Sequence, residues 1–79
     1  MEDLLEYLAR SLVDQPNEVS VDSFEEDDGT VVLELSVADD EAGKVIGKGG
    51  RTIAALRTVV KAASVKENRR VLVDVIDND

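Results

Sequence analysis

The clearest hydrophobic pattern in this chain lies at residues 30–37, where apolar and polar positions alternate. Four apolar side chains fall on one face of an extended segment there: Val31, Leu33, Leu35 and Val37. Strict alternation predicts a half-buried β-strand. A second alternating segment, residues 18–26, precedes it across the turn Asp27-Asp28-Gly29, in which glycine can take a positive φ. We therefore expect the two strands to pair as an antiparallel hairpin.

Helical spacing marks the segments on either side of this hairpin. Apolar residues recur every three or four positions over residues 2–14, which predicts an amphipathic helix. Pro16 cannot continue a helix and sets its limit. After the hairpin, a short helix is expected over about residues 40–46, with Asp39 or Asp40 as its N-cap.

A longer helix is predicted for residues 51–64. Its apolar face is formed by Ile53, Leu56, Val59, Val60 and Ala63. Residues 70–76 then alternate again and predict a last strand, with Val71, Val73 and Val75 pointing inward. The order α-β-β-α-α-β predicts an α+β fold, a three-stranded sheet with three helices on one face. We expect one domain to span residues 1–79.

The composition excludes most enzyme chemistry. The 79 residues include no cysteine and no histidine, which removes the usual general base, the thiolate ligands and the Ser-His nucleophile pair. Carboxylates remain, but no spaced calcium loop is present, so we expect no metal, no cofactor and no catalysis. A carboxylate hydrolase or nuclease is an alternative without a motif behind it. No apolar run reaches the ~20 residues of a membrane span and no signal peptide is recognisable, so we expect a cytoplasmic protein.

The net charge of −9 is distributed unevenly. Residues 44–70 hold eight of the nine basic residues and a single acid, Glu67. Because the Debye length is only about 8 Å at physiological salt, a basic surface can bind phosphate on an acidic protein. The alternative is that these lysines and arginines only solvate helix faces.

A glycine-rich turn, Gly47-Lys48-Gly49-Gly50, lies between the second and third predicted helices. Glycines let another backbone approach closely. The first amides of the helix at 51–64 lack intrahelical partners and suit a phosphate, while Lys48 and Arg51 can add charge-assisted contacts. Lys44 lies one turn upstream. A purely structural turn between helices is the alternative interpretation.

Two known phosphate loops do not fit this turn. Only three residues separate Gly43 from Gly47, and Gly49 rather than serine or threonine follows Lys48, so the turn is not a Walker loop. Thr52 stands where a dinucleotide fingerprint has its third glycine. Two aromatic residues, Tyr7 and Phe24, are too few for an RNA module built on base stacking.

The segment Val45-Ile46-Gly47-Lys48-Gly49-Gly50-Arg51-Thr52-Ile53 resembles the KH signature V-I-G-x-x-G-x-x-I, and the element order resembles the type II form of that fold. Four further segments are similar to the small bacterial stand-alone KH proteins, the KhpA-like family: Val37-Ala38, Gly43 through Arg57, Lys61-Ala62-Ala63 and Lys66 through Val71. The resemblance covers essentially the whole chain.

The resemblance implies binding of about four single-stranded RNA nucleotides, with the glycine loop clamping the backbone. The residues expected to contact RNA are Lys44, Ile46, Gly47, Lys48, Gly49, Gly50, Arg51 and Ile53. Among them Ile46 and Ile53 would floor the groove, whereas Val45 is expected to be core. Three more candidates have a solvated helix face or a strand edge as their alternative: Arg57, Lys61 and Arg70.

The resemblance also implies RNA chaperoning, small-RNA binding and post-transcriptional regulation, with control of cell growth, shape or division. It implies a homodimer, or a heterodimer with a larger RNA-binding protein that carries its own KH domain. Two interfaces remain open: the surface of the helix at 51–64, and a sheet face with Val32, Leu72 and Ile76. A module that docks proteins and binds little RNA is the alternative function.

Overall fold

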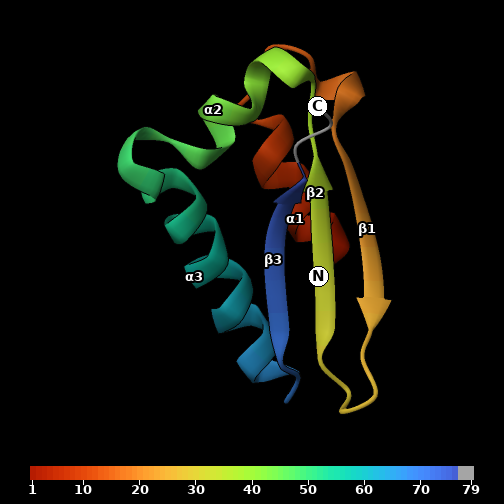
Figure 1. The fold of residues 1–79 in the computed structure, drawn as a ribbon. Coiled ribbons are helices and arrows are strands. Elements are labelled where there is room, and N and C mark those ends of the chain that lie inside the picture. The colour runs from red at the N-terminus through yellow and green to blue at the C-terminus, as the bar shows by residue number, and fades with distance from the viewer. Residues whose placement is uncertain (77–79) are drawn as a thin grey trace.

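The computed structural model describes residues 1–76. Its elements follow the predicted α-β-β-α-α-β order (Figure 1), with the bounds α1 (Glu2–Arg10), β1 (Ser20–Glu25), β2 (Val31–Ser36), α2 (Ala42–Ile46), α3 (Arg51–Lys66) and β3 (Val71–Ile76). Three single 3₁₀ turns join them: η1 (Pro16–Glu18), η2 (Asp39–Glu41) and η3 (Lys48–Gly50). In this part of the chain no helix is long and apolar enough to cross a membrane.

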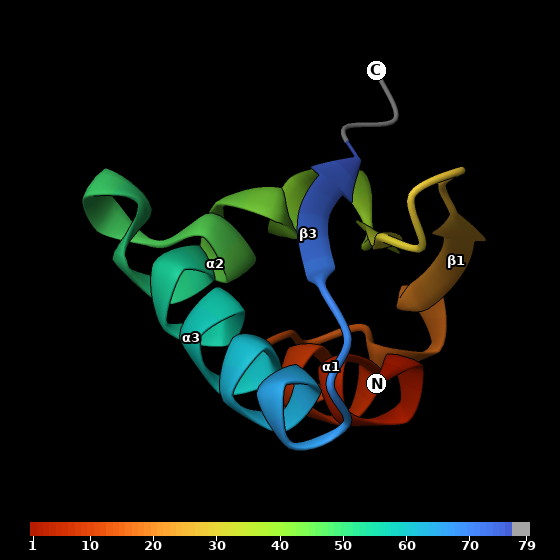
Figure 2. The same cartoon turned by 90° about the horizontal axis from the view of Figure 1, so that it is seen from below.

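The sheet has the order β1-β2-β3, with β2 in the centre. The predicted antiparallel hairpin of β1 and β2 is confirmed. β3 runs parallel to β2, because the chain returns to the sheet through α2 and α3, and a helical crossover brings a strand back in the same direction. Helices α1 and α3 lie under one face of this mixed sheet, and the other face is left open (Figure 2).

The core lies between that face and the helices. Its centre is β2, where Leu33 and Leu35 are completely buried, as the alternating pattern predicts. The other core side chains come from the three helices, from β3 and from the segments flanking the hairpin: Leu5, Ala9, Val19, Val37, Val45, Ile53, Leu56, Val60 and Val73. α2 contributes Val45 and packs mainly against α3, so the short helix is held beside the body of the protein.

Helix α1 is shorter than the predicted 2–14 and ends at Arg10. The amide of Leu12 donates to the carbonyl of Ala9, three residues earlier, at 3.0 Å; this spacing is that of a 3₁₀ turn and not of an α-helix. The Ser11 hydroxyl donates to the Tyr7 carbonyl at 2.9 Å. The chain therefore turns away within the predicted apolar stripe, and Leu12 is left 40% exposed.

The predicted apolar face of α3 is wrong at Val59, which is 45% exposed. The buried stripe of α3 runs instead through Ile53, Leu56, Val60 and Ser64. Val59 precedes Val60 by one residue, which rotates it about 100° away from the core. The buried Ser64 hydroxyl is satisfied by donating to the Lys61 carbonyl at 2.8 Å.

Helix α3 continues two residues beyond its predicted end and is closed by a left-handed cap. Asn68 has φ 59, its amide donates to the Val65 carbonyl at 3.0 Å, and the Arg69 amide donates to the Ser64 carbonyl at 2.9 Å. This pair of bonds satisfies carbonyls at the helix end and turns the chain into β3.

A buried carboxylate ties the end of α1 to the start of α2. Glu41 is 1% exposed, and its two oxygens accept from the backbone amides of Gln15 at 2.8 Å and Asp14 at 2.5 Å. The expectation that Asp39 or Asp40 caps the helix at 40–46 is wrong, since neither side chain caps it. Both acids at this point serve the loop before Pro16 instead: Glu41 accepts from its backbone amides, and Asp40 accepts from the side-chain amide of Gln15.

The bend between α2 and α3 depends on Gly47. This residue has φ 76 and ψ 170, a conformation open essentially only to glycine. A Cβ atom placed on it would lie 2.2 Å from the Thr52 hydroxyl oxygen and 2.9 Å from the Thr52 amide nitrogen. The start of α3 therefore packs directly on the Gly47 backbone.

Removing the buried carboxylate should cost the fold far more than removing its exposed neighbour. We expect Glu41→Ala to lower the free energy of unfolding by about 3 kcal/mol, because two amides and the Lys44 ammonium lose their acceptor. Asp40→Ala, which removes an exposed hydrogen bond from the side-chain amide of Gln15, should cost less than about 0.5 kcal/mol. Urea denaturation measures both, and equal losses would contradict this role for Glu41.

A methyl group should be tolerated very differently at two glycines of the same turn. Gly47→Ala combines a glycine-only conformation with the collision against Thr52, so we expect a loss of about 3 kcal/mol or more. Gly49 has φ 65 and open space around its Cβ position, so Gly49→Ala should cost only about 1–2 kcal/mol. The comparison is made by chemical denaturation, and a smaller loss at Gly47 than at Gly49 contradicts the packing described here.

Candidate nucleic-acid interface

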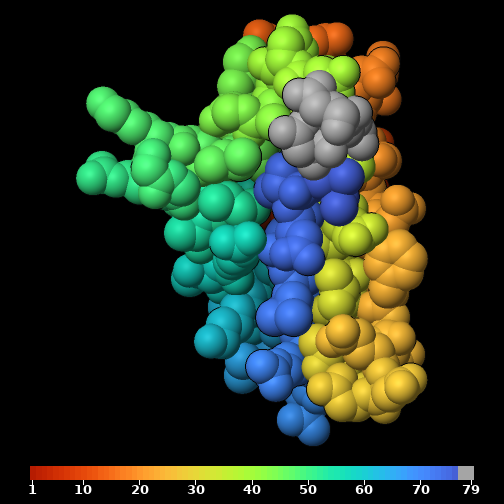
Figure 3. All heavy atoms as spheres, in the orientation of Figure 1, coloured from red at the N-terminus to blue at the C-terminus, as the bar shows by residue number. Residues whose placement is uncertain are grey.

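The glycine turn forms a protrusion from the body of the protein (Figure 3). Its own hydrogen bonds use the amide of Gly47, which donates to Gly43 at 2.8 Å, and the amide of Gly50, which donates to Gly47 at 3.1 Å. The amide of Arg51 donates to Lys48. The expectation that the first amide of α3 is available is therefore wrong for Arg51, since the 3₁₀ turn η3 takes it up. An anion at this turn can be bound by the amides of Lys48 and Gly49.

Two cations, Lys48 and Arg51, are exposed at this protrusion. Lys44 is not available in the same way. Its ammonium group lies 2.5 Å from an Asp14 carboxylate oxygen and 3.3 Å from a Glu41 oxygen. The hydrogen bond to Asp14, followed by that to Glu41, raises the pKa of Lys44 above its ordinary value. Its charge is thus compensated within the protein.

The apolar residues of the signature divide between core and surface. Val45 is fully buried, which confirms its expected place in the core. Ile53 is only 6% exposed and also belongs to the core, beneath the start of α3, whereas Ile46 is 39% exposed beside the turn. Of the two isoleucines expected to floor a groove, Ile46 alone presents a substantial surface.

A groove runs between α3 and the free edge of β3, with a volume of about 330 Å³. We call it the α3–β3 groove; it is lined by Arg57, Lys61, Val71, Leu72, Val73 and Asp74. The Arg57 Nε donates to the Val73 carbonyl oxygen at 3.0 Å, so this exposed side chain is held against the strand. Arg57 and Lys61, two candidates from the sequence, therefore share one surface.

The third candidate, Arg70, lies at the other end of α3. A helix of 16 residues is about 24 Å long, and Arg70 lies just beyond its far end, after the turn that closes it. It lies near Asp28, whose pKa is held below its ordinary value mainly by the Thr30 amide, with a smaller attraction from Arg70. The structure thus separates Arg70 from the glycine turn and brings it to the acidic tip of the hairpin.

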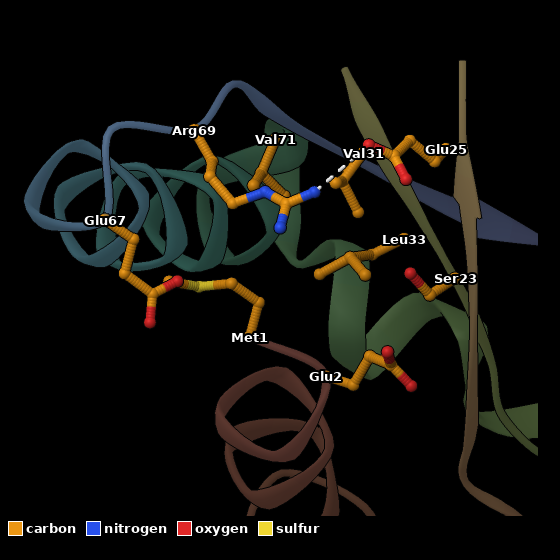
Figure 4. A pocket seen from close by; sticks show the side chains of 9 residues that line it. All are labelled: Met1, Glu2, Ser23, Glu25, Val31, Leu33, Glu67, Arg69 and Val71. Carbon is orange, nitrogen blue, oxygen red and sulfur yellow. Dashed lines mark hydrogen bonds and ion pairs between the residues drawn. The ribbon is translucent and has the colours of Figure 1, made fainter. Parts of the chain in front are cut away.

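A second cavity, of about 220 Å³, opens at this same end (Figure 4). Three carboxylates line it, Glu2, Glu25 and Glu67, against a single cation, Arg69. The Arg69 guanidinium lies 3.3 Å from a Glu25 oxygen, which joins the α3–β3 turn to β1. This excess of negative charge makes the cavity unsuited to phosphate. Among residues 1–76, no cluster of carboxylates could hold a metal ion.

The sequence reasoning missed an apolar surface groove between α1 and α3. It has a volume of about 290 Å³, and its lining contains no charged residue: Leu8, Ser11, Leu12, Thr52, Ala55, Leu56 and Val59. We call it the α1–α3 groove. Its exposed members Leu12 and Val59 were predicted to be core, so helical spacing alone could not reveal it.

The open face of the sheet has a different character. Asp22, Glu34 and Asp74 occupy one cross-strand row, because Asp22 pairs with Glu34 across β1 and β2 and Glu34 with Asp74 across β2 and β3. The apolar residues expected on this face lie in the rows beside them: Val32 pairs with Leu72, and Ser36 with Ile76. The predicted apolar patch is therefore divided by acids.

Comparison with known proteins matches this chain to one family over nearly its whole length. The model of the KhpA/KhpB KH domain matches residues 2–75. The protein named RNA-binding protein KhpA from Clostridium acetobutylicum is 54% identical over 76 residues, covering 96% of this chain and all of that protein. Its namesake from Halalkalibacterium halodurans is also 54% identical, covering 98% of this chain and all of that protein. The Treponema pallidum protein of the same name is 43% identical, over 96% of this chain and 94% of that protein.

Solved structures give the same fold. Part of Aquifex aeolicus Era superimposes with a TM-score of 0.60 at 16% identity, covering 98% of this chain but only 31% of Era. Era in complex with nucleotides 1506–1542 of 16S ribosomal RNA superimposes with a TM-score of 0.56 at 16% identity, over 94% of this chain and 28% of that one. Together with the mixed sheet, the three helices and the signature at 45–53, these matches identify the chain as a member of the KhpA/KhpB KH-domain family with a type II KH fold.

Proposed function

We propose that this protein binds single-stranded RNA, with the backbone held at the Gly47–Gly50 turn and the bases in the α3–β3 groove. The observation that carries the proposal is the continuity of these two surfaces. α3 begins at the exposed turn and, one to three turns later, presents Arg57 and Lys61 to the groove. Relatives that match over the full chain are named RNA-binding proteins.

The turn suits a phosphate for two physical reasons. Glycines leave its surface bare, so a phosphate can approach the amides of Lys48 and Gly49 without meeting a Cβ atom. The exposed Lys48 and Arg51 side chains then supply charge-assisted hydrogen bonds. Gly47 and Gly50 shape the turn, Ile53 supports it from the core, and Lys44 acts by anchoring α2 to Glu41.

The groove suits bases better than phosphates. Three of its six lining residues are apolar, and the side chains of Arg57, Lys61 and Asp74 supply both donors and acceptors of hydrogen bonds. The backbone amides and carbonyls of Val71, Val73 and Val75 face its edge, because alternate residues of a strand paired on one side point away from its partner. Ile46, directly before the turn, adds an exposed aliphatic side chain there. Such a site offers hydrogen bonds and aliphatic contact to unpaired bases.

One double substitution distinguishes RNA binding at the turn from the rival function, a protein-docking module with little affinity for RNA. We expect Lys48→Asp combined with Gly49→Asp to weaken binding of a short unpaired oligoribonucleotide at least about tenfold, because both phosphate contacts become repulsive. The melting temperature should change by only a few degrees, since both positions are exposed and aspartate tolerates positive φ. Fluorescence anisotropy at low salt measures the affinity.

The matched control makes the same change in net charge at the far end of α3. Lys66→Asp with Asn68→Asp alters one lysine and one residue at positive φ, so it should leave RNA affinity within about twofold once salt screens distant charges. For the wild type, three phosphate contacts predict a log-log salt slope near about −2. Equal losses in the two double variants would contradict a specific site at the turn.

We further propose that a second copy of this chain docks on the α1–α3 groove. The groove is apolar and uncharged, so two copies can meet there without bringing like charges together. Val59 and Leu12 are 45% and 40% exposed, and Ala55 allows close approach. The open sheet face is less suited to a second copy, because its acidic row would face another. Doubling would strengthen the weak binding of a four-nucleotide site by raising the effective concentration.

Self-association is tested by placing a charge in that groove. Val59→Asp should weaken dimerisation at least about tenfold, whereas Val65→Asp, at a 68% exposed valine outside the groove, should not. Sedimentation equilibrium measures both. A wild type that stays monomeric at high concentration contradicts docking of a second copy. A larger KH-containing protein would then be the remaining candidate partner for this groove.

Roles in RNA chaperoning, post-transcriptional regulation and growth or division stay predictions, as does the cytoplasmic location. The rival function, a protein-docking module with little affinity for RNA, is favoured by the α1–α3 groove alone. A protein-docking function does not explain the exposed cations of the turn or the contact of Arg57 with β3.

A further inference from the structure

We propose that the α3–β3 groove selects guanine among the four bases, through Arg57 and Asp74. This inference rests on the proposed function, since it assumes that an unpaired RNA base enters the groove. It adds which base is preferred and which side chains read it. Three features of the groove carry it: the free edge of β3, the fixed guanidinium of Arg57 and the carboxylate of Asp74.

The direction of the β3 backbone follows from its pairing. The amide of Val31 donates to the carbonyl of Arg70 at 2.8 Å, and Val31 is in register with Val71. In a parallel pair, Arg70, Leu72 and Asp74 therefore point their backbone groups at β2, while Val71, Val73 and Val75 point theirs at the groove. The bond from Arg57 Nε to the Val73 carbonyl agrees with this direction.

That same bond orients Arg57. A guanidinium carries five N–H donors in one plane, and the contact with Val73 at 3.0 Å uses the one on Nε. The four donors on the two terminal nitrogens remain, held as a fork beside the groove. Such a fork matches two adjacent acceptors in one plane, and O6 and N7 of guanine are the pair that arginine reads most often.

Asp74 supplies the opposite chemistry on the same groove wall. Its carboxylate only accepts hydrogen bonds when ionised, and it forms no ion pair among the residues 1–76, Arg57 included. Two parallel acceptors match the N1–H and N2–H donors on the Watson–Crick edge of guanine.

Guanine is the base that satisfies both side chains completely. It offers two adjacent acceptors to Arg57 and two adjacent donors to Asp74, four hydrogen bonds in all. Cytosine is the nearest competitor, since O2 and N3 can accept from the fork while its amino group gives Asp74 a single bond. Adenine places a donor beside N7, where the fork needs an acceptor, and uracil has only one N–H donor. The expected order is guanine, then cytosine, then adenine and uracil.

The test uses six oligouridylates that differ at one central base: guanine, cytosine, adenine, uracil, hypoxanthine or 7-deazaguanine. We expect the guanine oligonucleotide to bind the wild type at least about fivefold more tightly than the uracil or adenine one, the lower end of what one bidentate pair contributes. Hypoxanthine lacks the N2 amino group and 7-deazaguanine lacks N7. Each should therefore lose part of that advantage.

Two variants assign the preference to its residues. Arg57→Lys keeps the charge but removes the fork, so the affinity advantage of the guanine oligonucleotide over the uracil one should disappear. Asp74→Asn should raise affinity for the uracil and adenine oligonucleotides, because a negative charge is removed, and should lower the guanine advantage. Asp22→Asn is the control, because Asp22 lies in the same acidic row but two strands from the groove; it should raise all affinities slightly and leave the preference intact.

The outcomes separate this inference from the function on which it rests. Equal affinity for all six oligonucleotides, with binding still lost in the Lys48→Asp and Gly49→Asp double variant, overturns guanine selection and leaves RNA binding at the turn standing. A guanine preference that survives Arg57→Lys and Asp74→Asn also overturns it. Absence of binding to every oligonucleotide overturns both proposals together.

Discussion

The contact between the Gly47 backbone and the first turn of α3 sets the geometry of the proposed RNA site. Because Thr52 packs where a Cβ atom on Gly47 would stand, α2 can meet α3 at a sharp bend. The glycine turn at this bend protrudes from the body of the protein. The same contact fixes the start of α3, so that Arg57 and Lys61 fall on the side of the helix that faces β3. A single backbone conformation therefore joins the glycine turn to the α3–β3 groove.

Charge is separated over the molecule to match this arrangement. The cations of the turn and groove lie on the second half of a chain whose net charge is −9, while the acids are used elsewhere. The buried Glu41 accepts from the loop before Pro16 and from Lys44, Glu25 pairs with Arg69, and the open sheet face carries an acidic row. An acidic body of this kind confines polyanion binding to one surface and weakens contacts elsewhere.

Local patterns in the sequence predicted the fold well, and long-range contacts account for its failures. Alternation fixed the faces of β2 and β3, and the signature at 45–53 located the turn, because each depends on neighbouring residues. Glu41 could not be recognised as buried, since its partners at Asp14 and Gln15 lie 27 and 26 positions away. The exposure of Val59 and the fixed position of Arg57 likewise depend on where α1 and β3 lie against α3. The parallel direction of β3 follows from the α2–α3 crossover.

Amide chemical shifts during titration with an unpaired oligoribonucleotide test the central claim most directly. At low salt, we expect the largest changes at Lys48 and Gly49, with smaller ones along Arg57 and Val71 to Val75, and little change at Leu8, Leu12 or Val59. If the oligonucleotide shifts the α1–α3 groove or the hairpin tip and leaves the glycine turn unmoved, the turn is not where this protein holds RNA.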